Sequence, residues 1–157
     1  MAEKTAALGR KVPDFTLPST GGKPWKLSAA RGRSVVVYFY PRDNTSGCTS
    51  ESVAFRDLHD DFRKAGAVVV GVSPDGLASH DKFKAKYAFP FELLSDEKKK
   101  ACAIFGVWKE KSMYGRKYMG VERSTFLVDA EGALRREWRK VKVNGHAEEV
   151  LAAVRGL

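Results

Sequence analysis

The feature that most constrains this chain is a pair of uncharged, β-branched segments separated by an amphipathic stretch. The first runs from Ser34 to Tyr40 (SVVVYFY) and ends at Pro41, and the second is AVVVGV at residues 67–72. Continuous apolar runs of this length are typical of strands buried on both faces of a sheet. Residues 48–64, between them, carry apolar side chains at helical spacing and end at a glycine. The pattern predicts that residues 34–40 form a central strand of an α/β sheet.

The rest of the chain continues this alternation. The segments at 15–17 and 25–27 flank a Gly-Gly turn and predict an N-terminal hairpin. The other expected elements are a helix at 78–87, an extended piece at 91–94, a helix at 96–105, an irregular basic and aromatic loop at 108–120, two antiparallel strands at 124–128 and 134–138, and a helix at 146–154 capped by Asn144 or Gly145. Together they predict one domain over residues 1–157, a three-layer α/β sandwich around one mixed sheet.

Composition limits the class of protein. The chain has 157 residues and is 43% apolar, which suits a single globular domain and excludes a disordered chain. Its longest uncharged apolar stretches fall far short of the ~20 residues that cross a bilayer. The first twelve residues carry four charged side chains and no apolar run of signal-peptide length, so we expect a cytoplasmic protein without membrane contact.

The net charge of +9 is spread along the sequence. Residues 1–50, 51–100 and 101–157 carry net charges of +5, 0 and +4, and no basic tail exists. The densest cluster is Arg135, Arg136, Arg139, Lys140 and Lys142, which fits a solvated face. A basic nucleic-acid-binding module is therefore an alternative hypothesis, but a high isoelectric point by itself is weak support for it, and we expect no nucleic-acid partner.

The chain has two cysteines, Cys48 and Cys102. They are too few for a disulfide scaffold and too far apart for a CxxC redox or zinc pair. Adding the three histidines gives no short spacing of the kind that places two ligands on one metal ion. We therefore expect no metal site, and each cysteine must have its own role.

Cys48 stands in the first turn of the helix that follows the central strand. Unpaired backbone N–H groups and the helix macrodipole favour an anion at that position, so a thiolate is stabilised there. Open α/β sheets also place their sites at the carboxyl ends of strands. The alternative is a buried, inert cysteine that packs as a small hydrophobe.

The neighbours of Cys48 narrow its chemistry. A cysteine protease needs a histidine base, but His59 lies eleven residues along the same helix, about 16 Å away. We expect His80 and His146 to be surface or helix-capping residues. Dithiol exchange needs a second cysteine nearby, and Thr49, Ser50 and Glu51 follow instead. A single activated thiolate that attacks a small electrophile remains.

Two strings carry a family resemblance. Residues 38–51, YFYPRDNTSGCTSE, resemble the peroxidatic motif of peroxiredoxins. Residues 107–129, VWKEKSMYGRKYMGVERSTFLVD, are similar to the bacterioferritin comigratory protein or peroxiredoxin Q subgroup. The likeness extends to PDFTLPSTGG near the start and WRKVKVNGHAEEVL near the end, which is nearly the whole chain. It implies a thioredoxin-like fold and an enzyme that reduces hydrogen peroxide and organic hydroperoxides with thiols, without a bound cofactor.

The resemblance also implies roles for individual residues. Cys48 becomes the peroxidatic thiolate that is oxidised to a sulfenic acid, and the Thr45 hydroxyl faces the reacting oxygens. Pro41 shields the sulfur from water, and Arg123 holds the thiolate ionised and polarises the peroxide. Glu51 becomes a partner that orients the arginine. Each has a plainer alternative: Thr45 as a helix cap, Pro41 as a strand terminator, Arg123 as a surface charge and Glu51 as an ordinary first-turn acid.

The sequence differs from the family at the positions of the resolving cysteine, the second cysteine that forms a disulfide with the oxidised first one. Many members carry a second cysteine five residues after the first or in the next helix, and Val53 and Lys84 occupy those positions here. Cys102 is a possible resolving residue, but we favour a structural core cysteine because its helix would have to unravel to reach Cys48. We then expect an external reductant, thioredoxin or a glutathione/glutaredoxin system, and a monomer. A thioredoxin-fold partner protein without turnover is the remaining alternative.

Overall fold

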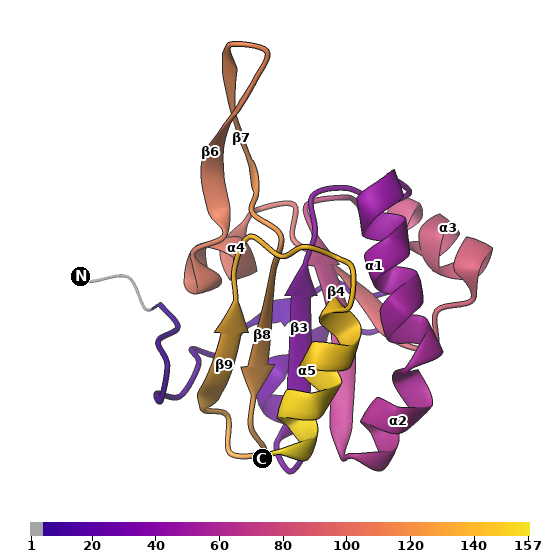
Figure 1. The fold of residues 1–157 in the computed structure, drawn as a ribbon, viewed down its shortest axis with the longest axis vertical. Coiled ribbons are helices and arrows are strands. Elements are labelled where there is room, and N and C mark those ends of the chain that lie inside the picture. Colours follow the sequence, from indigo (N-terminus) through magenta and orange to yellow (C-terminus); the bar gives the residue numbers. More distant parts are fainter. Residues whose placement is uncertain (1–4) are drawn as a thin grey trace.

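The computed structural model describes residues 5–157 and is built on a five-stranded sheet in the order β5-β4-β3-β8-β9 (Figure 1). The strands are β3 (Ser34–Phe39), β4 (Ala67–Ser73), β5 (Glu92–Ser95), β8 (Ser124–Val128) and β9 (Leu134–Trp138). β3 pairs in parallel with β4 and antiparallel with β8, so the sheet is mixed. The prediction of a central strand after residue 33 is confirmed. Within residues 5–157, no helix is long and apolar enough to cross a membrane.

Alternate side chains of β3 supply two separate cores. Val35, Val37 and Phe39 join one buried cluster, and Val36 and Tyr38 join the other. One face is covered by α1 (Ser46–Asp57), α2 (His59–Lys64), α3 (Leu77–Tyr87) and α5 (His146–Arg155). The other face is covered by the hairpin β1 (Thr16–Leu17) and β2 (Trp25–Lys26), the 3₁₀ helix η1 (Leu27–Ala30) and α4 (Lys100–Phe105). The arrangement is the expected three-layer sandwich with a thioredoxin-like fold and an N-terminal hairpin.

Two helices differ from their predicted lengths. The helix expected over residues 48–64 is interrupted at Leu58, whose backbone lies at φ −100° and ψ 4°, because α1 packs on α5 whereas α2 packs mainly on β4. The helix expected over residues 96–105 begins only at Lys100. Lys99 has a positive φ of 57°, and the Asp96 carboxylate instead accepts the N–H groups of Ala101 and Cys102.

The predicted loop at residues 108–120 is wrong. This segment forms a β-hairpin of β6 (Trp108–Met113) and β7 (Arg116–Val121), which projects away from the sheet (Figure 1). Tyr114 and Gly115 join the strands with φ values of 52° and 76°. Positive φ at both central residues matches a type I′ turn, which normally carries Asn-Gly. Tyrosine there gave no turn signal, and the mostly exposed strands lack an alternating pattern.

The directions of the strands bring segments that are distant in the sequence to the same end of the sheet. β3, β4 and β5 run parallel, so their carboxyl ends lie side by side. β8 runs antiparallel to β3 with Ser124 opposite Phe39, so β8 begins at the same edge. The loop before α1, the loop after β4 and the residues between β7 and β8 therefore meet there.

Candidate active site

Cys48 is the third residue of α1 and is almost completely buried, with 1% of its surface exposed. Its sulfur lies at the positive end of the helix, which favours an anion. Among residues 5–157, the one hydrogen-bond donor to Sγ is the Arg123 guanidinium, with Nη2 at 3.3 Å.

Arg123 bridges two acidic groups of α1. Nη2 points to the sulfur, while Nη1 donates to Glu51 Oε1 at 2.7 Å. The guanidinium stays cationic, because its pKa is raised further by Glu51 and Cys48 even though burial opposes this. This fork gives Arg123 a fixed position over the thiol, and it rules out the surface-charge alternative.

Local structure explains how residues 75 positions apart come together. Arg123 directly precedes β8, whose start lies beside the end of β3. Its backbone carbonyl also accepts the N–H of Val141 at 3.0 Å. Gly47 leaves the space that the side chain needs, because a Cβ there would lie 3.1 Å from Nη2. Gly47 was not among the predicted site residues, although it lies inside the Cys48 motif.

Glu51 is a buried carboxyl with 1% exposure, and its Oε2 is the buried side-chain polar atom without a partner in residues 5–157. Burial raises the pKa of Glu51 to about 7, and the neighbouring Arg123 opposes this rise without cancelling it. A first-turn surface acid would be exposed, so that alternative is excluded. At neutral pH this carboxyl is divided between its charged and protonated forms.

Thr45 and Pro41 belong to the loop between β3 and α1. Thr45 occupies the N-cap position, but its side chain makes no capping hydrogen bond. Its hydroxyl donates to the Arg42 carbonyl at 2.8 Å, which leaves its lone pairs as acceptors. Pro41 is half-buried, two residues beyond the end of β3.

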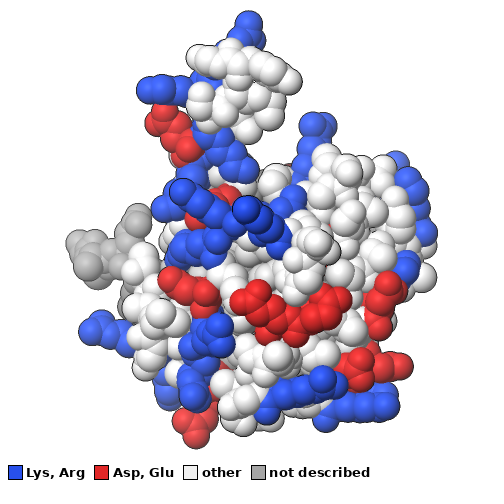
Figure 2. Space-filling model, viewed as in Figure 1, with Lys and Arg blue, Asp and Glu red and all other residues white. Residues whose placement is uncertain are grey.

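A second cation lies near the arginine. Lys111 on β6 has a lowered pKa, chiefly through partial burial and also through the charge of Arg123, with Cys48 acting in the opposite direction. Lys111 and Arg123 line a surface pocket of about 380 Å³ together with Lys109 and Lys140. Figure 2 shows basic side chains gathered at the hairpin and its base, with acidic groups interspersed over the rest of this face.

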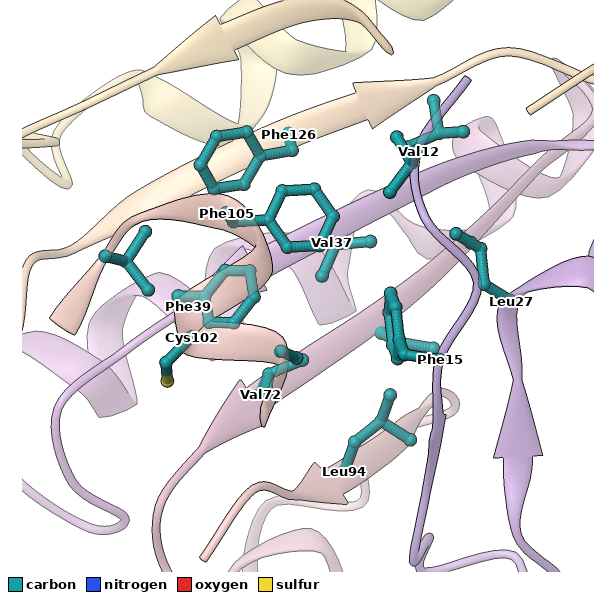
Figure 3. Packing of buried hydrophobic residues seen from close by; sticks show 14 of the residues in the cluster. Val12, Phe15, Leu27, Val37, Phe39, Val72, Leu94, Cys102, Phe105 and Phe126 are labelled. Carbon is teal, nitrogen blue, oxygen red and sulfur yellow. The ribbon is translucent and has the colours of Figure 1, made fainter. Parts of the chain in front are cut away.

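Cys102 lies on the opposite side of the sheet. It is fully buried on α4 and packs in the same cluster as Phe39, Val72 and Phe105 (Figure 3). Burial raises the pKa of its thiol far above the ordinary value, and the nearby Asp96 carboxylate raises it further. Cys48 belongs to the other cluster, so the sheet separates the two free thiols.

The histidine prediction was wrong in part. His80 is completely buried on α3, and His146, although it begins α5 next to its Gly145 cap, is only 4% exposed. His146 pairs with Thr125 at 2.8 Å, and burial lowers its pKa to about 4. Sequence gave no warning, because both residues stand among polar neighbours and are buried only by the packing of their helices.

The described residues include one cluster of side chains with metal-ligand chemistry, Asp43, Asp75 and His80. Its facing atoms already bind one another or nearby hydroxyl and amide groups: the Asp43 carboxylate accepts from His80 at 2.7 Å, and Asp75 accepts the Asp43 amide at 2.7 Å. These contacts describe a hydrogen-bonded network. No sequence pattern predicted it, because its members come from three separate segments.

Comparisons with known proteins agree with this geometry. The model of the AhpC/TSA family matches residues 8–137. Peroxiredoxin Bcp of Bacillus subtilis is 48% identical over 153 residues, covering 98% of both chains, and Peroxiredoxin Bcp of Xanthomonas campestris is 50% identical over 155 residues, covering 99% of this chain and 97% of the relative. A solved structure of the Xanthomonas campestris bacterioferritin comigratory protein superposes with a TM-score of 0.89 at 46% identity, covering 98% of both chains. The chain therefore belongs to the AhpC/TSA family, as a thiol peroxidase of the Bcp/PrxQ group of peroxiredoxins.

Proposed function

We propose that Cys48 is the peroxidatic residue of this enzyme. Its thiolate attacks the terminal oxygen of a hydroperoxide, so that an S–O bond forms while the O–O bond breaks and an alcohol or water leaves after protonation. The sulfur becomes a sulfenic acid. The observation that carries this proposal is the 3.3 Å contact between Arg123 and Sγ at the start of α1.

Arg123 and Thr45 interact with different parts of the peroxide. The guanidinium stabilises the negative charge that moves from sulfur to the leaving oxygen, an effect worth about 10² to 10³ in rate for one well-placed donor. Thr45 already donates its proton to Arg42, so it accepts the O–H of the incoming hydroperoxide. Glu51 holds the other branch of the guanidinium, and Pro41 limits water at the sulfur.

The sulfenic acid is recycled by external thiols in this proposal. One thiol displaces water and forms a mixed disulfide with Cys48, and a second thiol releases the reduced enzyme. The usual resolving positions cannot contribute, since Val53 and Lys84 carry no thiol that could form a disulfide with Cys48. Cys102 is a core residue in this scheme, because the sheet lies between the two sulfurs.

The proposal also includes the substrate class, the cellular location, the reductant and the oligomeric state. The Xanthomonas relative is described for alkyl peroxide reduction, and we extend organic hydroperoxides to this chain beside hydrogen peroxide. Both thiols are free, which suits the reducing cytoplasm. A thioredoxin or glutaredoxin system is the expected reductant. We expect the enzyme to work as a monomer, which sedimentation during turnover would check.

Peroxide consumption tests the role of Cys48. The Cys48→Ser variant should lose turnover of hydrogen peroxide and of an alkyl hydroperoxide with a thiol reductant. Cys102→Ser is the matched control and should keep it. Peroxidase activity that survives in Cys48→Ser would refute the assignment, and salt-sensitive retention on DNA independent of Cys48 would favour the nucleic-acid alternative.

Intact mass under non-reducing conditions tests the recycling scheme. After one equivalent of peroxide we expect the protein to gain one oxygen, or an adduct when an external thiol is present. A loss of two hydrogens that disappears in Cys102→Ser would instead identify an internal disulfide and assign Cys102 as the resolving residue.

A further inference from the structure

A buried ionic network surrounds Asp43, in the loop that leads into α1. Its carboxylate accepts three side-chain hydrogen bonds, from Tyr40 at 2.6 Å, from Ser79 at 2.7 Å and from His80 Nδ1 at 2.7 Å. Asp43 is buried, and its pKa stays below the ordinary value because these donors, His80 foremost, outweigh the cost of desolvation. The carboxylate is therefore ionised at neutral pH.

The partners of His80 define its protonation. Nδ1 faces the ionised Asp43 carboxylate, and Nε2 faces the Leu94 backbone carbonyl at 2.9 Å. Both atoms are acceptors, so both ring nitrogens must donate, and a neutral imidazole has only one N–H. The side chain has no exposed surface and lies beside one buried carboxylate, and its two acceptor partners match the contacts of an imidazolium.

The network connects the active-site loop to two other elements. His80 belongs to α3 and reaches the end of β5 through Leu94. The Asp43 backbone N–H donates to Asp75 beyond β4, and the next residue, Asn44, accepts from Lys86 of α3 at 3.2 Å. Asn44 also has a positive φ of 61°, a conformation that needs support from its surroundings.

We propose that the Asp43–His80 ion pair is the positioning device of the peroxidatic loop. It holds residues 41–45 against α3, and so fixes the Thr45 hydroxyl relative to Cys48, which lies in the first turn of α1. His80 touches no reacting atom and acts through Asp43. The inference deepens the proposed function and rests on it, since positioning has meaning only if Cys48 meets the peroxide in this loop.

The protonation of His80 can be tested in the unmodified protein. Long-range ¹⁵N NMR distinguishes an imidazolium from either neutral tautomer, and the chain has only three histidines to assign. Burial lowers the pKa of both His59 and His146, so at about pH 7.5 these two should be neutral. We expect His80 alone to show two protonated ring nitrogens. A neutral His80 would overturn the proposal, and this outcome does not depend on the role of Cys48.

The positioning role can be tested by comparing two reactions of one sulfur. In His80→Gln and in Asp43→Asn, the rate of Cys48 oxidation by peroxide should fall at least about tenfold, because a displaced loop misplaces groups that act on the peroxide. Alkylation of Cys48 by iodoacetamide needs no such groups and should change less than about twofold. The control His59→Gln should leave both rates unchanged.

Two results would contradict the proposal. Faster alkylation together with slower peroxide reaction would mean that the variants simply loosen the fold, and an unchanged peroxide rate would mean that the pair positions nothing.

The double variant should be no slower than the slower single variant, because both changes break one interaction. If Cys48→Ser kept peroxidase activity, the proposed function would fail while the NMR result still stood.

Discussion

The two faces of the sheet each bury one cysteine, and the two thiols face opposite electrostatic surroundings. Cys48 lies at the start of α1 with the Arg123 guanidinium 3.3 Å from its sulfur. Cys102 packs among aromatic and aliphatic side chains on α4, with the Asp96 carboxylate bound to its own backbone N–H. Exposure does not distinguish them, at 1% and 0%. The neighbouring charges differ in sign: a guanidinium lies beside Cys48, whereas burial and the Asp96 carboxylate raise the pKa of the Cys102 thiol.

The largest expected effect is the contrast in reactivity itself. When the reduced native protein meets a hydroperoxide together with dimedone, Cys48 should be trapped as a sulfenic acid at least about a thousand times faster than Cys102, whose thiol stays protonated. Peptide mass spectrometry with and without a denaturant measures both sites. Comparable labelling of Cys102 in the folded protein would break the comparison.

Removal of the arginine should have the next largest effect. Arg123→Ala is expected to slow peroxide reduction by about 10² to 10³, because it removes a donor to the developing charge. The loss should persist across the pH range of the assay, because the arginine acts on the charge of the transition state. Lys111→Ala, which removes a nearby cation that does not bind the sulfur, should cost much less. Activity that merely tracks the thiolate fraction across pH would contradict this role of the arginine.

Glu51 should make folding stability depend on pH. Because burial raises its pKa from 4.5 to about 7, the native state binds this proton more tightly than the unfolded state. The resulting stability is complete below about pH 4.5 and is lost as pH rises through about 7, a loss of up to about 3 kcal/mol. Glu51→Gln does not titrate, so between about pH 4 and pH 8 its free energy of unfolding should fall by that much less than that of the wild type.

Urea denaturation across this range measures the difference. Glu110→Gln, at an exposed glutamate of β6, should parallel the wild type and serves as the control. If the curves of Glu51→Gln and wild type also run parallel, the carboxyl is not held in a desolvated site.

The smallest effect concerns Gly47. An added Cβ in Gly47→Ala would meet Nη2 of Arg123 at 3.1 Å and move the guanidinium by a few tenths of an ångström. We expect peroxide reduction about two- to tenfold slower, although alanine should stabilise the helix by about 0.5–1 kcal/mol. Stopped-flow rates and denaturation curves measure the two quantities, with Ser50→Ala on the same helix as the control. Equal rates would show that this close approach has no function.

The local parts of the fold were predictable. The apolar runs that form β3 and β4 are typical of strands in the interior of a sheet, and they were predicted as such. The helix predicted at residues 78–87 differs from α3 by one residue. The hairpin β6-β7 was missed because Tyr114 occupies a left-handed position without a turn signal, and the break at Leu58 because neither glycine nor proline marks it.

Some features of the candidate site were also predictable from the sequence, and others were not. The Cys48 motif and the helix that follows are contiguous, so sequence placed the sulfur at a helix start. The Asp43–His80 pair and the burial of Glu51 were not visible, because they depend on α3 and β8 packing beside the loop.

The sequence by itself determined that a cysteine lies where a buried strand is followed by a helix, because the strand pattern, the cysteine and the helix pattern follow one another along the chain. Only the tertiary structure decided the surroundings of that cysteine. The antiparallel entry of β8 brings Arg123 across 75 residues to the sulfur, and the thickness of one sheet separates Cys102 from it. Electrostatic effects act over a few ångströms in space, and the distance along a chain does not fix that separation.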